Sequence, residues 1–206
     1  MLYSGIEYLC KIVFRIQIGK IQGIENLPPP PCVIAANHVS PYDPMLLVVM
    51  LYSWLKKFNK KLMFLTNRKV IVLFAAFPKT LGMFRGTKRG LNEAIEYLRK
   101  GMPIGIFPNR DRKPGQIKKF HLGPAYLAAR ADVPIVPIGI KTREEVNPSW
   151  DIIKIIKSFF YKKNLYIGKP IYVNKRSLYK TTEELTEAVG SLINKEITKH
   201  TPIPNN

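Results

Sequence analysis

Short apolar runs, bounded by proline, glycine or charged residues, recur along the chain and predict β-strands. One run, Arg15 to Ile21, alternates between apolar and polar residues. Four others are apolar at nearly every position: Cys32–Ala36, Leu62–Leu65, Ile104–Phe107 and Ile135–Ile140. A continuous apolar run of this length suits a strand that is covered on both faces. We therefore expect a central sheet enclosed by other elements.

Helical patterns fall between these strands. Asp43 and Pro44 form a start signal, with the aspartate as N-cap and the proline at the first helical position. Further helices are expected from near Gly90 to Gly101, from Gly123 to Arg130, and from Thr181 onward, where Glu184 completes a capping box. Strands that alternate with helices predict an α/β fold with a mixed central sheet flanked by helices.

The first 16 residues predict an amphipathic helix. Glu7, Lys11 and Arg15 share one face, and apolar residues cover much of the rest. The helix is either a membrane anchor or an element that docks on its own domain. The remaining residues, 17–206, are expected to form one domain. No cleavable signal peptide is visible, and the apolar stretch Met45–Leu55 is well short of the roughly 20 residues that span a bilayer.

The charge balance is strongly basic, with 33 Lys and Arg against 14 Asp and Glu and a formal net charge of +19. Such a charge attracts anionic lipid, phosphorylated ligands or nucleic acid. No zinc finger, RNA-recognition signature or helix-turn-helix pattern is present, so no specific nucleic-acid partner is expected. The two cysteines, Cys10 and Cys32, form neither a CxxC motif nor a cluster with histidine. We expect no metal site, no disulfide framework and no bound cofactor.

The segment from Ala36 to Pro44 carries the candidate chemistry. A buried-type strand runs directly into Asn37 and His38, and Asp43 follows five residues after the histidine. The intervening turn can bring the carboxylate to the imidazole, where it would fix the tautomer and orient the ring as a general base. The alternative is that His38 is an ordinary turn histidine and Asp43 only a helix cap.

Several ordered blocks resemble one known family. Asn37, His38 and Asp43 match the NHx4D signature of the glycerophosphate and lysophospholipid acyltransferases, and the resemblance extends over about residues 17 to 173. The other matching blocks are Gly23–Pro28, Gly82–Arg85, Gly101–Pro108, Phe120–Ala125 and Val133–Ile138. Several blocks in the family's order are far more specific than a lone histidine and aspartate.

The resemblance implies a reaction and a set of site residues. It implies that His38, oriented by Asp43, deprotonates a lipid hydroxyl that attacks the thioester of acyl-CoA or acyl-carrier protein. It implies a lysophosphatidate-type acceptor, with Arg85 and Arg112 as phosphate ligands. Further substrate-binding candidates are Asn37, Ser40, Asn109, Asp111 and His121. Such an enzyme would sit on the cytoplasmic face of a membrane, as a peripheral or monotopic protein bound to an anionic surface.

One block departs from the family pattern. After Phe107 and Pro108 the family usually continues Glu-Gly-Thr-Arg, whereas this chain has Asn109, Arg110, Asp111 and Arg112. Only the last arginine matches, and His121 stands where the family often has lysine. The departure leaves two alternatives open: an acyltransferase for a different lipid acceptor, or a basic domain that binds anionic lipid or nucleic acid without turnover.

Overall fold

The computed structural model describes residues 15–40, 42–66, 82–108, 119–142, 157, 159–173 and 177–199. The predicted N-terminal helix lies almost entirely outside these residues. The described elements, in chain order, are η1 (Arg15–Gln17), β1 (Ile18–Gln22), η2 (Ile24–Asn26), β2 (Val33–Ala36), α2 (Asp43–Met50), α3 (Tyr52–Lys57), β3 (Met63–Thr66), β4 (Met83–Arg85), α5 (Lys88–Arg99), β5 (Ile104–Ile106), α6 (Gly123–Ala131), β6 (Ile135–Thr142), β7 (Lys163–Ile167) and α8 (Leu178–Lys199).

The described strands form one seven-stranded sheet in the order β1-β7-β6-β2-β5-β3-β4. All neighbouring pairs are parallel except β6 and β7, which are antiparallel. The sheet is therefore mixed, as predicted. Because β2, β3, β4, β5 and β6 run the same way, their carboxyl ends meet at one edge of the sheet, the edge at which open α/β sheets place their ligands.

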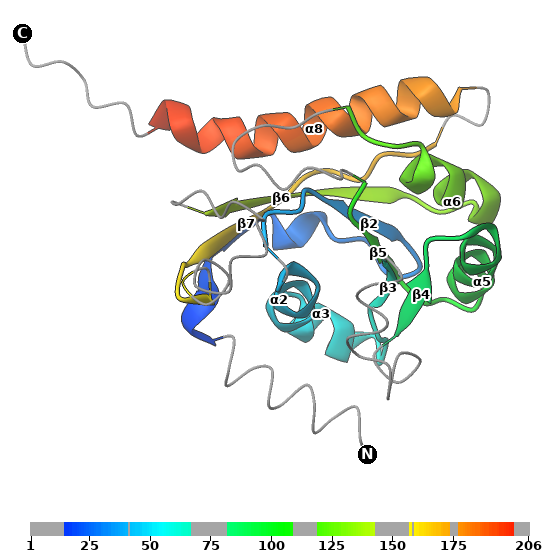
Figure 1. Ribbon diagram of the computed structural model, residues 1–206, viewed down its shortest axis with the longest axis horizontal. Coiled ribbons are helices and arrows are strands. Elements are labelled where there is room, and N and C mark those ends of the chain that lie inside the picture. The colour runs from blue at the N-terminus through cyan, green and yellow to red at the C-terminus, as the bar shows by residue number, and fades with distance from the viewer. Residues whose placement is uncertain are drawn as a thin grey trace, which may run out of the picture.

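Helices cover both faces of the sheet (Figure 1). On one face, α2 and α3 pack against alternate residues of β2, β3, β6 and β7, including Ile34, Phe64, Ile138 and Leu165. On the other face, α5, α6 and α8 pack against the strand residues that point the opposite way, including Val33, Ile104 and Ile135. Every residue of β2 is buried. The two apolar cores confirm the fold class and explain why the central strands are apolar at successive positions.

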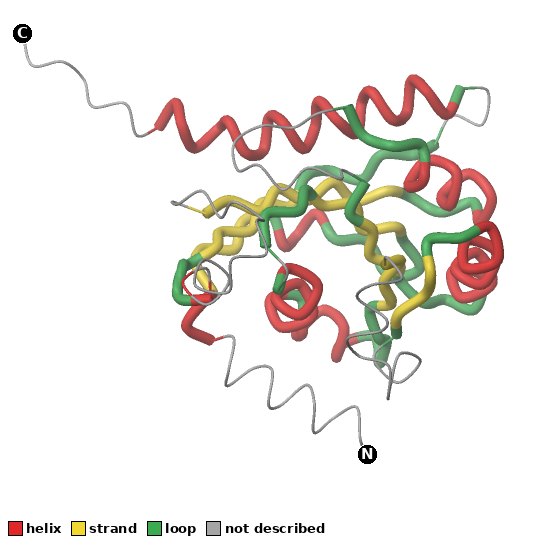
Figure 2. The backbone as a smooth tube through the Cα atoms, in the orientation of Figure 1, coloured by secondary structure: helices red, strands yellow, loops and turns green. Residues whose placement is uncertain are grey.

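Three details of the secondary structure differ from the prediction (Figure 2). The first strand starts at Ile18, because Arg15–Gln17 forms a 3-10 turn instead. The apolar pattern did not reveal β4, which is only three residues long, or β7, which begins with Lys163 and Asn164. Helix α8 begins before Thr181, whose hydroxyl donates to the Ser177 carbonyl at 3.2 Å. Ser177 is the residue that caps this helix, since its hydroxyl accepts from the Lys180 N–H at 3.3 Å.

Candidate active site

The carboxyl end of β2 is fixed by the side chain of Asn37. This side chain is buried, its Nδ2 donates to the Ile140 carbonyl of β6 at 2.9 Å, and its Oδ1 accepts from the Ile140 N–H at 2.6 Å. The amide of Asn37 thus continues the β2–β6 ladder beyond the last paired residues, Ala36 and Ile138. His38, the next residue, therefore follows a backbone position that is anchored to β6. That Asn37 contacts substrate stays a prediction.

The turn after His38 brings Asp43 back to the imidazole. The Asp43 N–H donates to the Ser40 carbonyl at 3.1 Å and closes the turn. Asp43 Oδ2 lies 2.8 Å from His38 Nδ1 and accepts the backbone N–H groups of Val39 and Ser40, each at 2.7 Å. The predicted pairing of histidine and carboxylate is therefore present. The prediction that Asp43 is the N-cap of the helix was wrong. Tyr42 occupies the N-cap position, and Asp43 is the first helical residue.

These contacts determine which imidazole nitrogen carries hydrogen. An ionised carboxylate only accepts hydrogen bonds, so the Nδ1 that faces Asp43 is protonated. In the neutral ring, Nε2 then keeps its lone pair and can accept a proton. Asp43 is fully buried, and it is compensated by three donors to Oδ2 and by the N-terminus of α2, which favours negative charge. Such an arrangement is chemically able to serve as an oriented general base.

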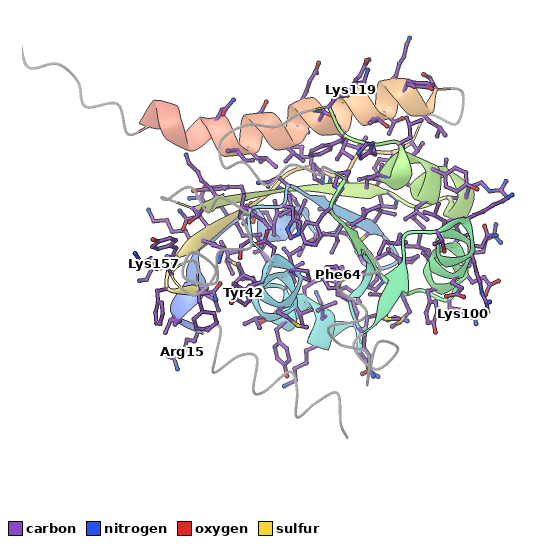
Figure 3. All side chains as sticks on the ribbon, in the orientation of Figure 1. Arg15, Tyr42, Phe64, Lys100, Lys119 and Lys157 are labelled. Carbon is purple, nitrogen blue, oxygen red and sulfur yellow. The ribbon has the colours of Figure 1, made fainter. Side chains whose placement is uncertain are left out.

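The imidazole is also held by aromatic rings. The rings of His38 and Phe107 stack with centroids 4.5 Å apart and planes inclined by 27°, and Phe107 in turn lies nearly parallel to Phe64 at 6.1 Å. The ring of Phe64, which is labelled in Figure 3, can lie over the neighbouring strand β5 because Gly105 of that strand has no side chain. A Cβ on Gly105 would lie 2.6 Å from Phe64 Cδ1. The His38 side chain is not fully enclosed by these contacts, since it remains 15% exposed.

Two potential nucleophiles, one before β2 and one after it, are buried. Ser40 is fully buried, and its hydroxyl accepts from the Tyr42 N–H at 3.2 Å, which stabilises the turn. Cys32, immediately before β2, is buried, and burial raises its thiol pKa to about 12. A thiol with that pKa stays protonated at neutral pH and is a poor nucleophile. The described residues hold no group of three or more His, Cys, Asp or Glu side chains that could bind a metal.

A family model described as Acyltransferase matches residues 19–141, which include the whole of β2, the turn and Asp43. The 1-acyl-sn-glycerol-3-phosphate acyltransferase of Pseudomonas aeruginosa is 31% identical over 139 residues, which are 64% of this chain and 52% of that protein. The chain belongs to the acyltransferase family. The 1-acyl-sn-glycerol-3-phosphate acyltransferase BAT2, chloroplastic, of Brassica napus is 31% identical over 168 residues, or 77% of this chain and 46% of that protein.

The chain spans about half the length of these two curated relatives. A solved structure, that of the 1-acyl-sn-glycerophosphate acyltransferase PlsC from Thermotoga maritima, has a TM-score of 0.69 to this chain at 20% identity. The likeness covers 99% of this chain and 81% of that chain, and it shows a shared fold. Within the described residues, no helix has both the length and the apolar character required to cross a bilayer.

The remaining candidate residues of this family member lie at the same sheet edge or outside the described residues. Arg85 ends β4, paired with Thr66 of β3, and its side chain is not described. Strands β2 and β4 are three positions apart in the sheet, which is about 14 Å at the usual spacing between strands. Asn109, Asp111 and Arg112 lie outside the described residues. His121 is exposed, and its backbone N–H donates to the Pro108 carbonyl at 3.1 Å, next to Phe107.

Sequence reasoning missed three residues that are linked, directly or through one another, to the dyad formed by His38 and Asp43. Phe107 was part of a matching block but was not expected to touch His38. Gln17 and Lys163, which lie far apart in sequence, are both fully buried and hydrogen-bonded to each other at 2.6 Å. A lysine at the start of a strand resembles a solvent-facing residue in the sequence, so only the fold reveals this pair.

Proposed function

We propose that this protein transfers a fatty acyl group from a thioester donor to the hydroxyl of a lysophosphatidate-type lipid. The observation that carries the proposal is the contact of 2.8 Å between His38 Nδ1 and Asp43 Oδ2 at the carboxyl end of the central strand. Membership of the acyltransferase family supplies the reaction class. The 1-acyl-sn-glycerol-3-phosphate acyltransferases of two organisms among its relatives support this acceptor.

The proposed reaction uses one base and no enzyme nucleophile. His38 Nε2 takes the proton of the acceptor hydroxyl as its oxygen attacks the thioester carbonyl. The tetrahedral intermediate collapses, the carbon–sulfur bond breaks, and the imidazolium returns the proton to the departing thiolate. The products are an ester and a free thiol. Asp43 stabilises the transient imidazolium and keeps Nε2 directed at the hydroxyl.

A phosphate on the acceptor would bind at the same edge of the sheet. Arg85, at the end of β4, is the ligand we propose for it, together with Arg112. The span of about 14 Å between β2 and β4 suits a glycerol phosphate whose hydroxyl lies at His38 and whose phosphate meets a long arginine side chain. The donor is acyl-CoA or acyl-carrier protein. The basic chain, at +19, would associate with an anionic membrane surface as a peripheral or monotopic protein on its cytoplasmic face.

The test is thiol release by the purified protein, with acyl-CoA or acyl-carrier protein as donor and lysophosphatidate in vesicles as acceptor. Wild type should form the diacyl product, and His38→Ala should lose about 10²- to 10⁴-fold in kcat, the usual effect of removing a general base. Arg85→Ala should raise KM for the phosphorylated acceptor more than it lowers kcat. Equal rates for wild type and His38→Ala would refute the proposal.

A different acceptor is the second candidate, favoured by the altered block Asn109–Arg112. The same assay with a panel of lysophospholipids and of lipid alcohols without phosphate separates the two. A strict requirement for lysophosphatidate would rule out the second candidate. His38-dependent transfer to another lipid, without transfer to lysophosphatidate, would establish it.

A further inference from the structure

Lys163 is a lysine with no exposure to solvent. It is the first residue of β7, its side chain is fully buried, and its Nζ donates to Gln17 Oε1 at 2.6 Å. Gln17 is itself fully buried in the 3-10 turn before β1. Lysine is almost never fully buried without a compensating partner, because its charge loses hydration. Its position therefore needs an explanation.

The sheet register places Lys163 near the end of β2. Lys163 pairs with Thr142 of β6, two residues beyond Ile140, which holds the side chain of Asn37. Side chains alternate along a strand, so Lys163 lies on the same face as Leu165 and Ile167. Both of those residues belong to the core under α2 and α3. Asp43 begins α2 on that same face (Figure 1).

Charge links the lysine to the dyad. Burial lowers the pKa of Lys163, and the negative charge of Asp43 raises it, so the ammonium and the carboxylate stabilise each other. Asp43 Oδ2 already accepts from His38, Val39 and Ser40. Asp43 Oδ1 is buried and has no hydrogen-bond partner within the described part of the chain, as is true of Gln17 Nε2 and Thr142 Oγ1. Each of these three residues is linked to Lys163: Gln17 accepts a hydrogen bond from its Nζ, Thr142 is its partner in the sheet, and Asp43 carries the opposite charge.

We propose that Lys163, held by Gln17, is a positioning residue that balances the buried carboxylate of Asp43 and sets the pH range in which His38 can accept a proton. The inference rests on the proposed function, in which His38 must be neutral to act. A cation close to the Asp43 carboxylate opposes protonation of the imidazole, since it offsets part of the negative charge that would stabilise an imidazolium. Without the cation, the Asp43 carboxylate would stabilise an imidazolium more strongly.

No other described charge on the surrounding elements takes this place. Helix α2 carries no charged residue besides Asp43. Arg15 of η1 and Lys20 of β1 are exposed, whereas Lys141 of β6 and Tyr166 of β7 belong to the opposite face of the sheet by alternation. The register partners of Lys163, Ile18 and Thr142, do not titrate.

The test is the pH dependence of kcat/KM for acyl transfer by the full chain, measured in wild type, Lys163→Met and Lys163→Arg. In Lys163→Met the acid limb should move to higher pH, by about half a unit to one unit for the loss of a nearby buried charge. In Lys163→Arg, which keeps the charge, the limb should stay at the wild-type position. Should Lys163→Met fail to fold, Lys163→Gln gives the same test, because it lacks the charge and can still donate to Gln17.

Lys162→Met is the matched control, since it removes the same charge from the adjacent, exposed position. Its acid limb should coincide with that of wild type. An unmoved limb in the neutral variants of Lys163, or an equal shift in Lys162→Met, would overturn the inference and leave the proposed function standing. Absence of His38-dependent activity in wild type would instead refute the proposed function itself.

Discussion

The ring of Phe107 lies flat against the imidazole of His38, with centroids 4.5 Å apart. The contact joins the residues that follow two neighbouring strands, because β2 and β5 pair side by side. Asp43 fixes one edge of the imidazole through Nδ1, and Phe107 fixes the plane of the ring. Two independent contacts therefore fix the orientation of Nε2, as the proposed general base requires.

The stacking contact predicts the effect of Phe107→Leu. Leucine keeps an apolar side chain but cannot support the ring plane, so kcat should fall by about tenfold while KM changes less, since small misplacements of a catalytic group cost one to two orders of magnitude. The control is Phe58→Leu, which shortens another half-buried ring of the same core away from His38. Steady-state kinetics of the two variants check this. Equal effects of both substitutions would show that stability alone is at work.

The buried amide of Asn37 predicts a stability effect. Asn37→Ala removes two hydrogen bonds and leaves the backbone N–H and carbonyl of Ile140 without these partners. The free energy of unfolding should therefore fall by about 2–4 kcal/mol. Asn26→Ala is the control, because Asn26 makes one half-buried bond, from Nδ2 to the Ile167 carbonyl at 2.8 Å. Urea denaturation measures both. A loss for Asn37→Ala no larger than that for Asn26→Ala would contradict the role we assign to the amide.

The dyad was predictable from sequence because it is local. His38 and Asp43 are five residues apart, and one turn determines whether they meet. Phe107 and Lys163 were not predictable as neighbours, because their positions depend on the pairing of β5 with β2 and of β7 with β6. The central strands followed from continuous apolar runs, whereas β7 did not, since its first two residues are polar. The prediction that Asp43 is an N-cap failed because aspartate is common both at helix starts and as a buried hydrogen-bond partner of histidine.

The buried thiol of Cys32 predicts how stability depends on alkaline pH. Burial raises its pKa from 9.0 to about 12, so between these values the unfolded chain loses the thiol proton and the folded protein keeps it. The folded state then binds more protons, and stability falls as pH rises, by up to about 1.4 kcal/mol per pH unit from this group. In Cys32→Ala this part of the loss should disappear.

Urea denaturation of wild type and Cys32→Ala, at about pH 8 and at about pH 10.5, measures the difference. At the lower pH the alanine variant should be the less stable protein, because it leaves a small cavity. The gap between the two proteins should narrow at the higher pH. A gap that does not change with pH would show that Cys32 loses its proton as readily in the folded protein as in the unfolded chain.

The most direct measurement is a double-mutant cycle on the dyad, with single-turnover rates of acyl transfer for wild type, His38→Ala, Asp43→Asn and the double variant. Because Asp43 is proposed to act through His38, the double variant should be no slower than His38→Ala, which itself should lose about 10²- to 10⁴-fold in rate. Asp43→Asn should lose activity only while His38 is present. Losses that multiply in the double variant, or a His38→Ala protein as fast as wild type, would contradict a base oriented by its carboxylate.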